Sequence, residues 1–421
     1  MVESISTQKL NAAIGKIDEA TRGPNAKIPG IVCVAVNRNG DLILSHASGL
    51  TKLGGESPMS LGTVLWLASC TKLLTGIACM QLVEQGRLAL DDAAQLDGLA
   101  PELKKRKVLT KGPGGEYTLV PQERPITLRM LMTHTSGFGY AFDDLNISDW
   151  ARPIGLDDFG GRQEEVLLRP LVFQPGTAFQ YGVSMDWVGL IIERVTGMSL
   201  EKYFQTYIFA PLGINDIAFR PTQDMKRRLG YMHQRAPDGS LSVTDHLLRH
   251  ALVTDESDEP FCMGGCGCFG TPREYAKILS VLLNNGTCPK TQAKLLNPET
   301  IRHMFTDQIP TLPIDLNEPC PSAKPHLANP CPIIHKPGNP TNGWGLSFAL
   351  SHQKSEKGRA AGSASWEGLA NLYWFADRES GVAMVFAAQV LPYGDYQVVR
   401  LCEEVERLVY ESRGTEARSS L

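Results

Sequence analysis

Apolar and polar residues alternate in a way that predicts β-strands at both ends of the chain. Two strand-like runs flank Asn39-Gly40 in PGIVCVAVNRNGDLILSHASG (residues 29–49), and an Asn-Gly pair between apolar runs is a strong hairpin signal. Near the carboxyl end, ANLYWFAD and GVAMVFAAQV are apolar runs separated by RESG, which predicts a second hairpin. Amphipathic helices are expected beside these strands, at about 7–21 and about 395–411.

The residues between the two ends have mainly helical patterns. A helix is expected to begin at Ser69 and to end at Gly86, because apolar residues recur along this stretch at helical spacing. Further helices are expected at 127–138, at 184–206 with a turn at Gly197, and at 271–285. The segment 104–125 is rich in Gly and charge and predicts an exposed loop, while the Pro-rich segment 309–340 predicts an irregular surface excursion.

This order of elements favours an α+β fold, in which one antiparallel sheet receives strands from both chain ends and is flanked by helices. We expect an α/β sheet domain from residues 1–89 and 256–421. A mainly helical subdomain, residues 90–255, would be inserted beside it. A ligand cleft is expected at the interface of the two parts.

Composition and charge narrow the class of protein. The chain has 421 residues, of which 43% are hydrophobic and 20% charged, as in globular enzymes. Its net charge of −4 argues against a nucleic-acid partner, since the longest basic run is KKRK at 104–107. The amino terminus lacks a signal-peptide core and no stretch reaches the length of a membrane span, so we expect no membrane partner and a cytoplasmic location.

The ten cysteines raise the question of a metal site. The densest group is CMGGCGC, with Cys262, Cys266 and Cys268, but no partner pair shows the spacing of a zinc finger. We therefore expect neither a metal nor another cofactor. Disulfides are not expected in a reducing cytosol.

Serine and lysine recur three residues apart at several places, and the context of each pair separates them. The pairs are Ser6 and Lys9, Ser69 and Lys72, Ser199 and Lys202, and Ser351 and Lys354. Ser69 stands at the first turn of an apolar helix, where residues three apart share a face and the helix dipole favours an oxyanion. Partial burial would lower the pKa of Lys72 towards the neutral amine that activates a serine. The alternative is that Ser69 caps the helix and Lys72 is exposed.

Tyr181, in PGTAFQYGVSMDW, follows a turn and precedes a helix, where a phenol can project into a cleft and share proton transfer with a lysine. An ordinary half-buried tyrosine is the alternative. The chain holds no G-x-S-x-G and no H-E-x-x-H, which argues against an α/β-hydrolase and against a zinc peptidase. We interpret His134, in LMTHTSG, as a turn residue, because no Asp and Ser in order around it complete a triad.

Four segments in order resemble the serine β-lactamase-like superfamily, in its class C and family VIII esterase branch. They are LASCTKLLTGIACMQLVEQGRLALDD, LRMLMTHTSGF, PGTAFQYGVSMDWVGLIIERVTG and FAPLGINDIAF. The resemblance runs from about residue 8 to 410. LASCTKLLT and YGVSMDW look in particular like the fungal polyketide acyltransferases (transesterases) of statin biosynthesis.

The resemblance implies a catalytic group and its neighbours. The nucleophile falls on Ser69, the lysine on Lys72 and the tyrosine on Tyr181; GSASWEGLANLYW matches the strand beside the site. The oxyanion hole would then be the backbone N–H groups of Ser69 and Leu369. The second lysine of penicillin-recognising members is replaced by Trp366, which makes a hydrophobic ester or thioester a better substrate than a β-lactam.

Aromatic residues near the expected cleft suggest a roomy apolar pocket, although several are equally compatible with the core. The substrate-binding candidates are Trp366, Gly368, Trp344, Tyr140 and Tyr393.

The resemblance predicts a serine acyltransferase that moves an acyl group from an ester or thioester donor to a secondary-metabolite alcohol. The donor is expected to be a small molecule or an acyl-carrier domain of a polyketide synthase. Two alternatives stay open, namely an esterase or lactone hydrolase of the same fold and a non-catalytic binding protein.

Overall fold

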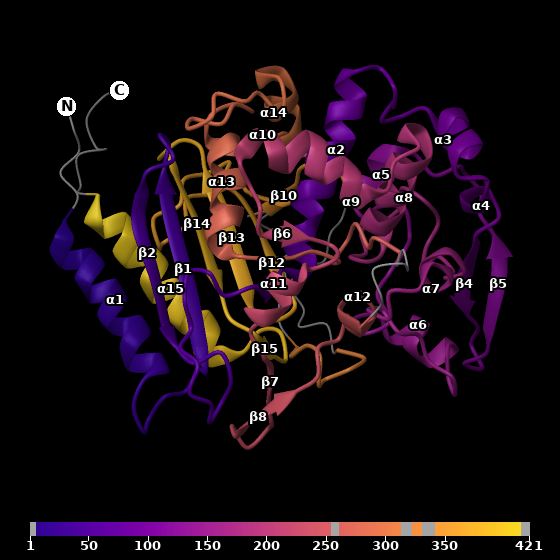
Figure 1. The fold of residues 1–421 in the computed structure, drawn as a ribbon. Helices are drawn as coiled ribbons and strands as arrows, with labels where there is room; N and C mark the ends of the chain where they lie inside the picture. Colours follow the sequence, from indigo (N-terminus) through magenta and orange to yellow (C-terminus); the bar gives the residue numbers. More distant parts are fainter. Residues whose placement is uncertain (1–5, 254–260, 313–321, 331–341, 414–421) are drawn as a thin grey trace.

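The structure, a computed structural model, describes residues 6–253, 261–312, 322–330 and 342–413. Its centre is a seven-stranded antiparallel sheet to which both ends of the chain contribute, and Figure 1 shows its indigo and yellow strands side by side. In spatial order the strands are β10 (Asn342–Trp344), β11 (Ala349–Ser351), β12 (Ala364–Gly368), β13 (Leu372–Asp377), β14 (Val382–Ala387), β1 (Gly30–Asn37) and β2 (Leu42–Gly49). Both predicted hairpins are confirmed, since β1 pairs with β2 and β13 with β14.

Helices cover both faces of this sheet. The terminal helices α1 (Thr7–Thr21) and α15 (Tyr396–Ser412) pack on each other and on one face, with a core that includes Ile17, Phe386 and Val405. Helix α13 (Pro272–Leu283) packs against β1, β13 and β14, where it contributes to a larger second core. Its first turn is capped by Thr271, whose side chain accepts from the Glu274 amide, and Pro272 stands at the first helical position.

The segment between β2 and α13 is mainly helical and lies to one side of the sheet (Figure 1). Helix α2 (Thr71–Glu84) is buried almost all round, and helix α8 (Ser184–Thr196) packs against it. The other helices here are α3 (Ala93–Leu99), α4 (Pro101–Lys104), α5 (Leu128–Met132), α6 (Leu145–Trp150), α7 (Gln163–Leu167), α9 (Leu200–Phe204), α10 (Ala210–Leu212), α11 (Gln223–Arg227) and α12 (Arg249–Val253); a π-helical turn covers Gln205–Phe209 and α14 (Pro298–Met304) follows α13.

Short strands complete the fold. They are β3 (Leu65–Trp66), β6 (Ile217–Ala218) and β9 (Phe269–Gly270) in one small sheet, β7 (Met232–Arg235), β8 (Leu241–Thr244) and β15 (Val390–Leu391) in another, and β4 (Lys107–Lys111) with β5 (Tyr117–Pro121) as a hairpin. That hairpin shows that the prediction of a loop over 104–125 was wrong. Glycines 112, 114 and 115 form only its tip, while Val108 and Leu109 in the first strand are both buried.

Most other element predictions are confirmed within a few residues. Helix α8 ends at Gly197, which adopts a left-handed φ of 70° as a helix-ending glycine does, and α9 follows it. The helix expected over 127–138 is shorter, because it ends at Met132 before His134 takes a positive φ of 56°. Part of the Pro-rich 309–340 segment lies outside the described residues.

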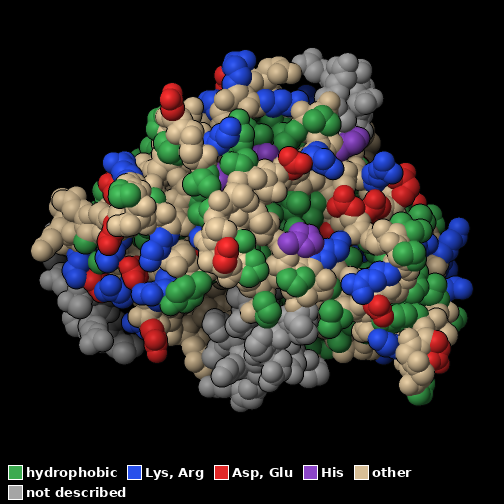
Figure 2. Space-filling model, turned by 90° about the horizontal axis from the view of Figure 1, so that it is seen from below, with side chains coloured by type: hydrophobic (Ala, Val, Ile, Leu, Met, Phe, Trp, Pro, Cys, Tyr) green, Lys and Arg blue, Asp and Glu red, His purple; other side chains and the backbone are tan. Residues whose placement is uncertain are grey.

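The observed antiparallel sheet flanked by helices is the architecture that a resemblance to β-lactamase/transpeptidase-like proteins leads us to expect. The division into residues 1–89 with 256–421 and residues 90–255 stays a prediction. On the face drawn in Figure 2, basic and acidic side chains are interspersed rather than gathered by sign. Within the described ranges, none of the helices has the length and apolar character needed to cross a membrane.

Candidate active site

Ser69 lies in a tight 3-10 turn (Ala68–Cys70) between strand β3 and helix α2. Ala68 has a φ of 45°, a left-handed conformation that an alanine rarely adopts and that marks a constrained turn. Strand β12 passes close to this turn at Gly368, where a Cβ atom would lie 2.8 Å from the carbonyl oxygen of Leu67. Only 9% of Ser69 is exposed, so the turn presents its hydroxyl to an enclosed space.

Lys72 lies one turn later on the same helix face and is fully buried. Its amine lies 3.1 Å from the Ser69 Oγ, 3.1 Å from the Tyr140 hydroxyl and 2.8 Å from the carbonyl oxygen of Gly265. Burial lowers the pKa of Lys72 to about 8, although the nearby Asp186 carboxylate opposes the shift. The alternative of an exposed lysine beside a capping serine is therefore wrong, and the amine is neutral in part of the molecules near neutral pH.

Tyr181 lies next to both Ser69 and Lys72. Its ring centroid lies 4.5 Å from the Lys72 amine, and its hydroxyl accepts a hydrogen bond from the Trp366 indole at 3.0 Å. Burial raises the pKa of Tyr181 well above the usual value, while hydrogen bonds with Ser69 and Trp366 partly oppose the rise. Trp366 thus gives the phenol a neutral donor at the position where the resemblance would place a second lysine.

Tyr140, expected as a substrate-binding residue, is 1% exposed, and its hydroxyl lies next to the Lys72 amine. Its loop is held by Asp158, which accepts from the amides of Ala141 and Phe142 at 3.0 and 2.9 Å. Asp158 in turn forms a fully buried ion pair with Arg169 at 2.5 Å. The ion pair therefore fixes the loop that brings the Tyr140 hydroxyl to the lysine.

His134 is buried beside Tyr181 with ring centroids 4.7 Å apart. Its Nδ1 accepts from the Gly182 amide at 3.3 Å, which requires the proton of the neutral ring to be on Nε2. Burial lowers the pKa of His134 well below its usual value, so the ring is uncharged. These contacts support a structural role on the turn after α5.

The next candidates, for substrate binding and for the oxyanion hole, lie near Trp366. Trp344 is 1% exposed, packs edge-on against Trp366 at 4.6 Å, and donates to the carbonyl oxygen of Met132 at 3.2 Å. Leu369 follows β12 directly and lies beside the Ser69 turn through Gly368. The proposed oxyanion hole of Ser69 and Leu369 stays a prediction.

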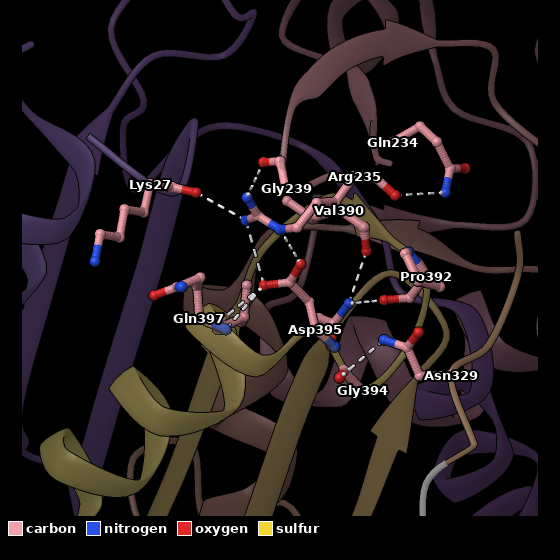
Figure 3. A network of polar contacts seen from close by, with 12 residues as sticks. Lys27, Gln234, Arg235, Gly239, Asn329, Val390, Pro392, Gly394, Asp395 and Gln397 are labelled. Carbon is pink, nitrogen blue, oxygen red and sulfur yellow. Dashed lines mark hydrogen bonds and ion pairs between the residues drawn. The ribbon is translucent and has the colours of Figure 1, made fainter. Parts of the chain in front are cut away.

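Tyr393 lies just after β15, next to a network of polar contacts around Asp395 that Figure 3 shows. Its hydroxyl donates to the carboxyl group of Glu367, the neighbour of Trp366 in β12. Asp395 anchors the same loop, because its carboxylate pairs with Arg235 and accepts from the Gln397 amide at 3.1 Å. Asn329 joins the network from another part of the chain through the carbonyl oxygen of Gly394 at 3.2 Å.

The CMGGCGC segment contributes a backbone group to the surroundings of Lys72. Cys262, Cys266 and Cys268 are buried, and among the described residues there is no group of three or more His, Cys, Asp or Glu side chains that could hold a metal ion. The segment brings the carbonyl oxygen of Gly265 to Lys72.

Sequence reasoning missed two residues of the site, Gly265 and Asp186. Asp186 accepts from the Gly265 amide at 2.8 Å. A signal was available, because Asp186 is a carboxylate within a run of apolar residues that the helical pattern predicts to be buried.

The other serine-lysine pairs lack such surroundings. Ser199 caps helix α9 by accepting from the amide of Lys202 at 3.3 Å, Ser6 precedes α1, and Ser351 ends β11. The spacing of serine and lysine is therefore the same in four places, and only Ser69 and Lys72 meet in a buried site.

Comparisons with known proteins match nearly the whole chain. The Beta-lactamase family model matches residues 14–400. A lovastatin esterase of Penicillium rubens is 36% identical over 87% of this chain and 90% of that protein. A monacolin J acid methylbutanoyltransferase of Aspergillus terreus is 33% identical over 91% of this chain and 92% of that protein. Among solved structures, unliganded simvastatin synthase from Aspergillus terreus superposes with a TM-score of 0.81 at 28% identity, covering 97% of this chain and 99% of that one.

Proposed function

The chain belongs to the beta-lactamase family, and from this premise we propose that it is a serine acyltransferase acting through an acyl-serine intermediate. The observation that carries the proposal is the buried contact of 3.1 Å between the Lys72 amine and Ser69, in surroundings that lower the pKa of the amine to about 8. A neutral amine in this place has a lone pair that accepts the hydroxyl proton.

In the first half-reaction, Lys72 takes the Ser69 proton while Oγ attacks the acyl carbonyl carbon. The negative oxygen of the tetrahedral intermediate is stabilised by the proposed N–H donors of Ser69 and Leu369. The intermediate then expels the alcohol or thiol, which receives the proton by way of Tyr181, and Ser69 is left as an ester.

In the second half-reaction an acceptor alcohol occupies the place of the leaving group. Its proton passes to Tyr181 and Lys72 while its oxygen attacks the acyl-serine, and the proton returns to Ser69 as the new ester leaves. Water in the same place would give hydrolysis, so an esterase is the second candidate, favoured by the likeness to the lovastatin esterase.

The proposed class of substrate is supported by the similar proteins and by Trp366 beside Tyr181. By likeness to the methylbutanoyltransferase, we propose a short branched acyl group and a polyketide alcohol as donor group and acceptor. Trp366 stands where the resemblance would place the second lysine, and its neutral indole cannot form an ion pair with the carboxylate of a β-lactam, which supports weak action on such drugs. An acyl-carrier domain as the natural donor is the finer proposal, and it predicts faster acylation from a carrier-bound thioester than from the same acyl group on a small thiol.

Mass spectrometry of the intact protein after mixing with an acyl thioester tests the assignment. The wild type should gain one acyl group on Ser69, and Ser69→Ala should gain none. Ser199→Ala is the matched control, because it removes the serine of another pair with the same spacing and should leave the adduct unchanged. An adduct that persists in Ser69→Ala refutes the nucleophile.

Turnover separates the two candidates. Release of the acyl group that accelerates when alcohols are added supports transfer, and release at one rate with every alcohol tested supports hydrolysis. No adduct under any condition would support a binding protein.

A further inference from the structure

A fully buried carboxylate stands behind the catalytic lysine. Asp186, in the first turn of helix α8, accepts a hydrogen bond from the Gly265 amide at 2.8 Å through Oδ1. The carbonyl oxygen of the same glycine accepts from the Lys72 amine at 2.8 Å. One residue of backbone therefore connects the carboxylate to the amine.

Position 265 has room only for glycine in this arrangement. A Cβ atom there would lie 2.8 Å from Oδ2 of Asp186, closer than real Cβ atoms approach, and 3.1 Å from Cγ and from Oδ1. The neighbouring backbone is tied to helix α2, because Thr75 donates to the Gly264 carbonyl at 2.6 Å and Thr71 accepts from the Cys268 amide at 3.0 Å. The loop and the lysine are thus held by the same helix.

The second oxygen of Asp186 lacks a hydrogen-bond donor among the described residues, although it is buried. A buried carboxylate without its full set of donors is costly unless its charge meets an opposite charge. Lys72 is the first opposite charge acting on Asp186, ahead of Arg169, while Asp158 acts in the other direction. Burial raises the pKa of Asp186 only to about 6, so the carboxylate is charged at neutral pH and above.

Asp186 is also the anion that faces the amine. The titratable groups around Lys72 are Cys70, His134, Tyr140, Tyr181, Asp186 and Cys266. Burial raises the pKa of the two cysteines and of the two tyrosines and lowers that of the histidine, so all five are uncharged near neutral pH. Of these six described side chains, only Asp186 carries a negative charge.

We propose that Asp186 is a positioning residue that acts through Gly265, where it orients the Lys72 amine towards Ser69 and supplies the charge that stabilises the ammonium formed during each proton transfer. The inference rests on the proposed function, in which the Ser69 proton moves to Lys72 and from there to the leaving group. Asp186 forms and breaks no bond in these steps. Its charge lowers the free energy of the protonated lysine, because opposite charges attract strongly where water is excluded.

Asp186→Asn tests the charge while it keeps a side-chain oxygen for the Gly265 amide. The readout is the burst rate of Ser69 acylation by a chromogenic ester as a function of pH. The acylation rate falls at low pH as Lys72 becomes protonated, and the pH at which the rate is half its plateau is the midpoint. Loss of the Asp186 charge should lower this midpoint by about one pH unit, as expected for one nearby opposite charge. The plateau rate should fall by up to about tenfold, which corresponds to one pKa unit of basicity.

Gly265→Ala is the second variant, because its methyl group must displace the Asp186 carboxylate while every charged group stays in the chain. It should move the midpoint in the same direction, and it decides the question if Asp186→Asn does not fold. Asp377→Asn is the matched control, a buried aspartate on the sheet that accepts from Ala360 and Tyr410 and should leave the midpoint unchanged.

A midpoint that stays at the wild-type value in the folded variants, whether the plateau falls or not, overturns the inference and leaves Asp186 with a structural role. This result is distinct from failure of the proposed function, in which the wild type itself forms no acyl-Ser69.

Discussion

Replacing Trp366 with phenylalanine removes the indole N–H that donates to the Tyr181 hydroxyl at 3.0 Å and keeps an aromatic ring in the wall. Phenylalanine can partly retain the ring contacts with Tyr181 and Trp344, whose ring centroids lie 4.9 Å and 4.6 Å from that of Trp366. The substitution therefore tests one hydrogen bond at the phenol.

The size of the effect follows from the charge on the phenol oxygen. A hydrogen bond to a neutral partner contributes about 0.5–1.5 kcal/mol and one to a charged partner about 1.5–3 kcal/mol. If Tyr181 gains negative charge as it passes a proton, the transition state loses about 1–1.5 kcal/mol more than the ground state does. This difference slows acylation by about fivefold to about tenfold.

Stopped-flow measurement of the acylation burst with a chromogenic ester provides the rate. Trp344→Phe is the matched control, because it also removes a buried indole hydrogen bond, the one of 3.2 Å to Met132, but does not affect the Tyr181 hydroxyl directly. Both variants should lose some stability, and only Trp366→Phe should lose the acylation rate. Equal rates for the two variants would refute the claim that the indole supports proton transfer by Tyr181.

Three further predictions use other buried groups of the structure. Acylation of the wild type should rise about tenfold for each pH unit until it levels near pH 8, because only neutral Lys72 accepts the serine proton; a rate independent of pH across this range would contradict the assignment. Asp158→Ala leaves Arg169 buried without its carboxylate and should lower the free energy of unfolding in urea by about 3–5 kcal/mol; a loss of about 1 kcal/mol or less, as for an exposed pair, would argue against it. Burial raises the pKa of Glu367 from 4.5 to about 8, so the stability contributed by its neutral form is present below pH 4.5 and is lost as the pH rises through 8. Glu367→Gln should flatten this decline in thermal unfolding measured across the same pH window, and an unchanged pH dependence would contradict the shift.

The elements with local signals could be predicted from the amino-acid sequence alone. The apolar runs around Asn39-Gly40 and around RESG became hairpins, and the amphipathic end segments became α1 and α15, because strand and helix periodicities depend on neighbouring residues only. The β4–β5 hairpin was missed because the glycines at its tip and the charges on its exposed side resemble a loop. Its strand character depends on the burial of Val108 and Leu109 against the rest of the fold.

The proposed catalytic residues could be named from the sequence, but their contacts could not. The sequence supplied Ser69, Lys72 and Tyr181 as candidates through helical spacing and family likeness, and the structure brings the three together. Tyr140 was a candidate for substrate binding, yet its hydroxyl lies on the lysine, since the Asp158–Arg169 pair draws its loop inwards.

The electrostatic surroundings of Lys72 depend on the tertiary structure. Four serine-lysine pairs have equal spacing in the sequence, and burial of one of them lowers the pKa of its amine. Gly265 reaches Lys72 from 193 positions away along the chain, and its amide is bound by Asp186. Such contacts depend on how distant segments pack, because the charge state of a buried group is set by its neighbours in space rather than by its neighbours in sequence.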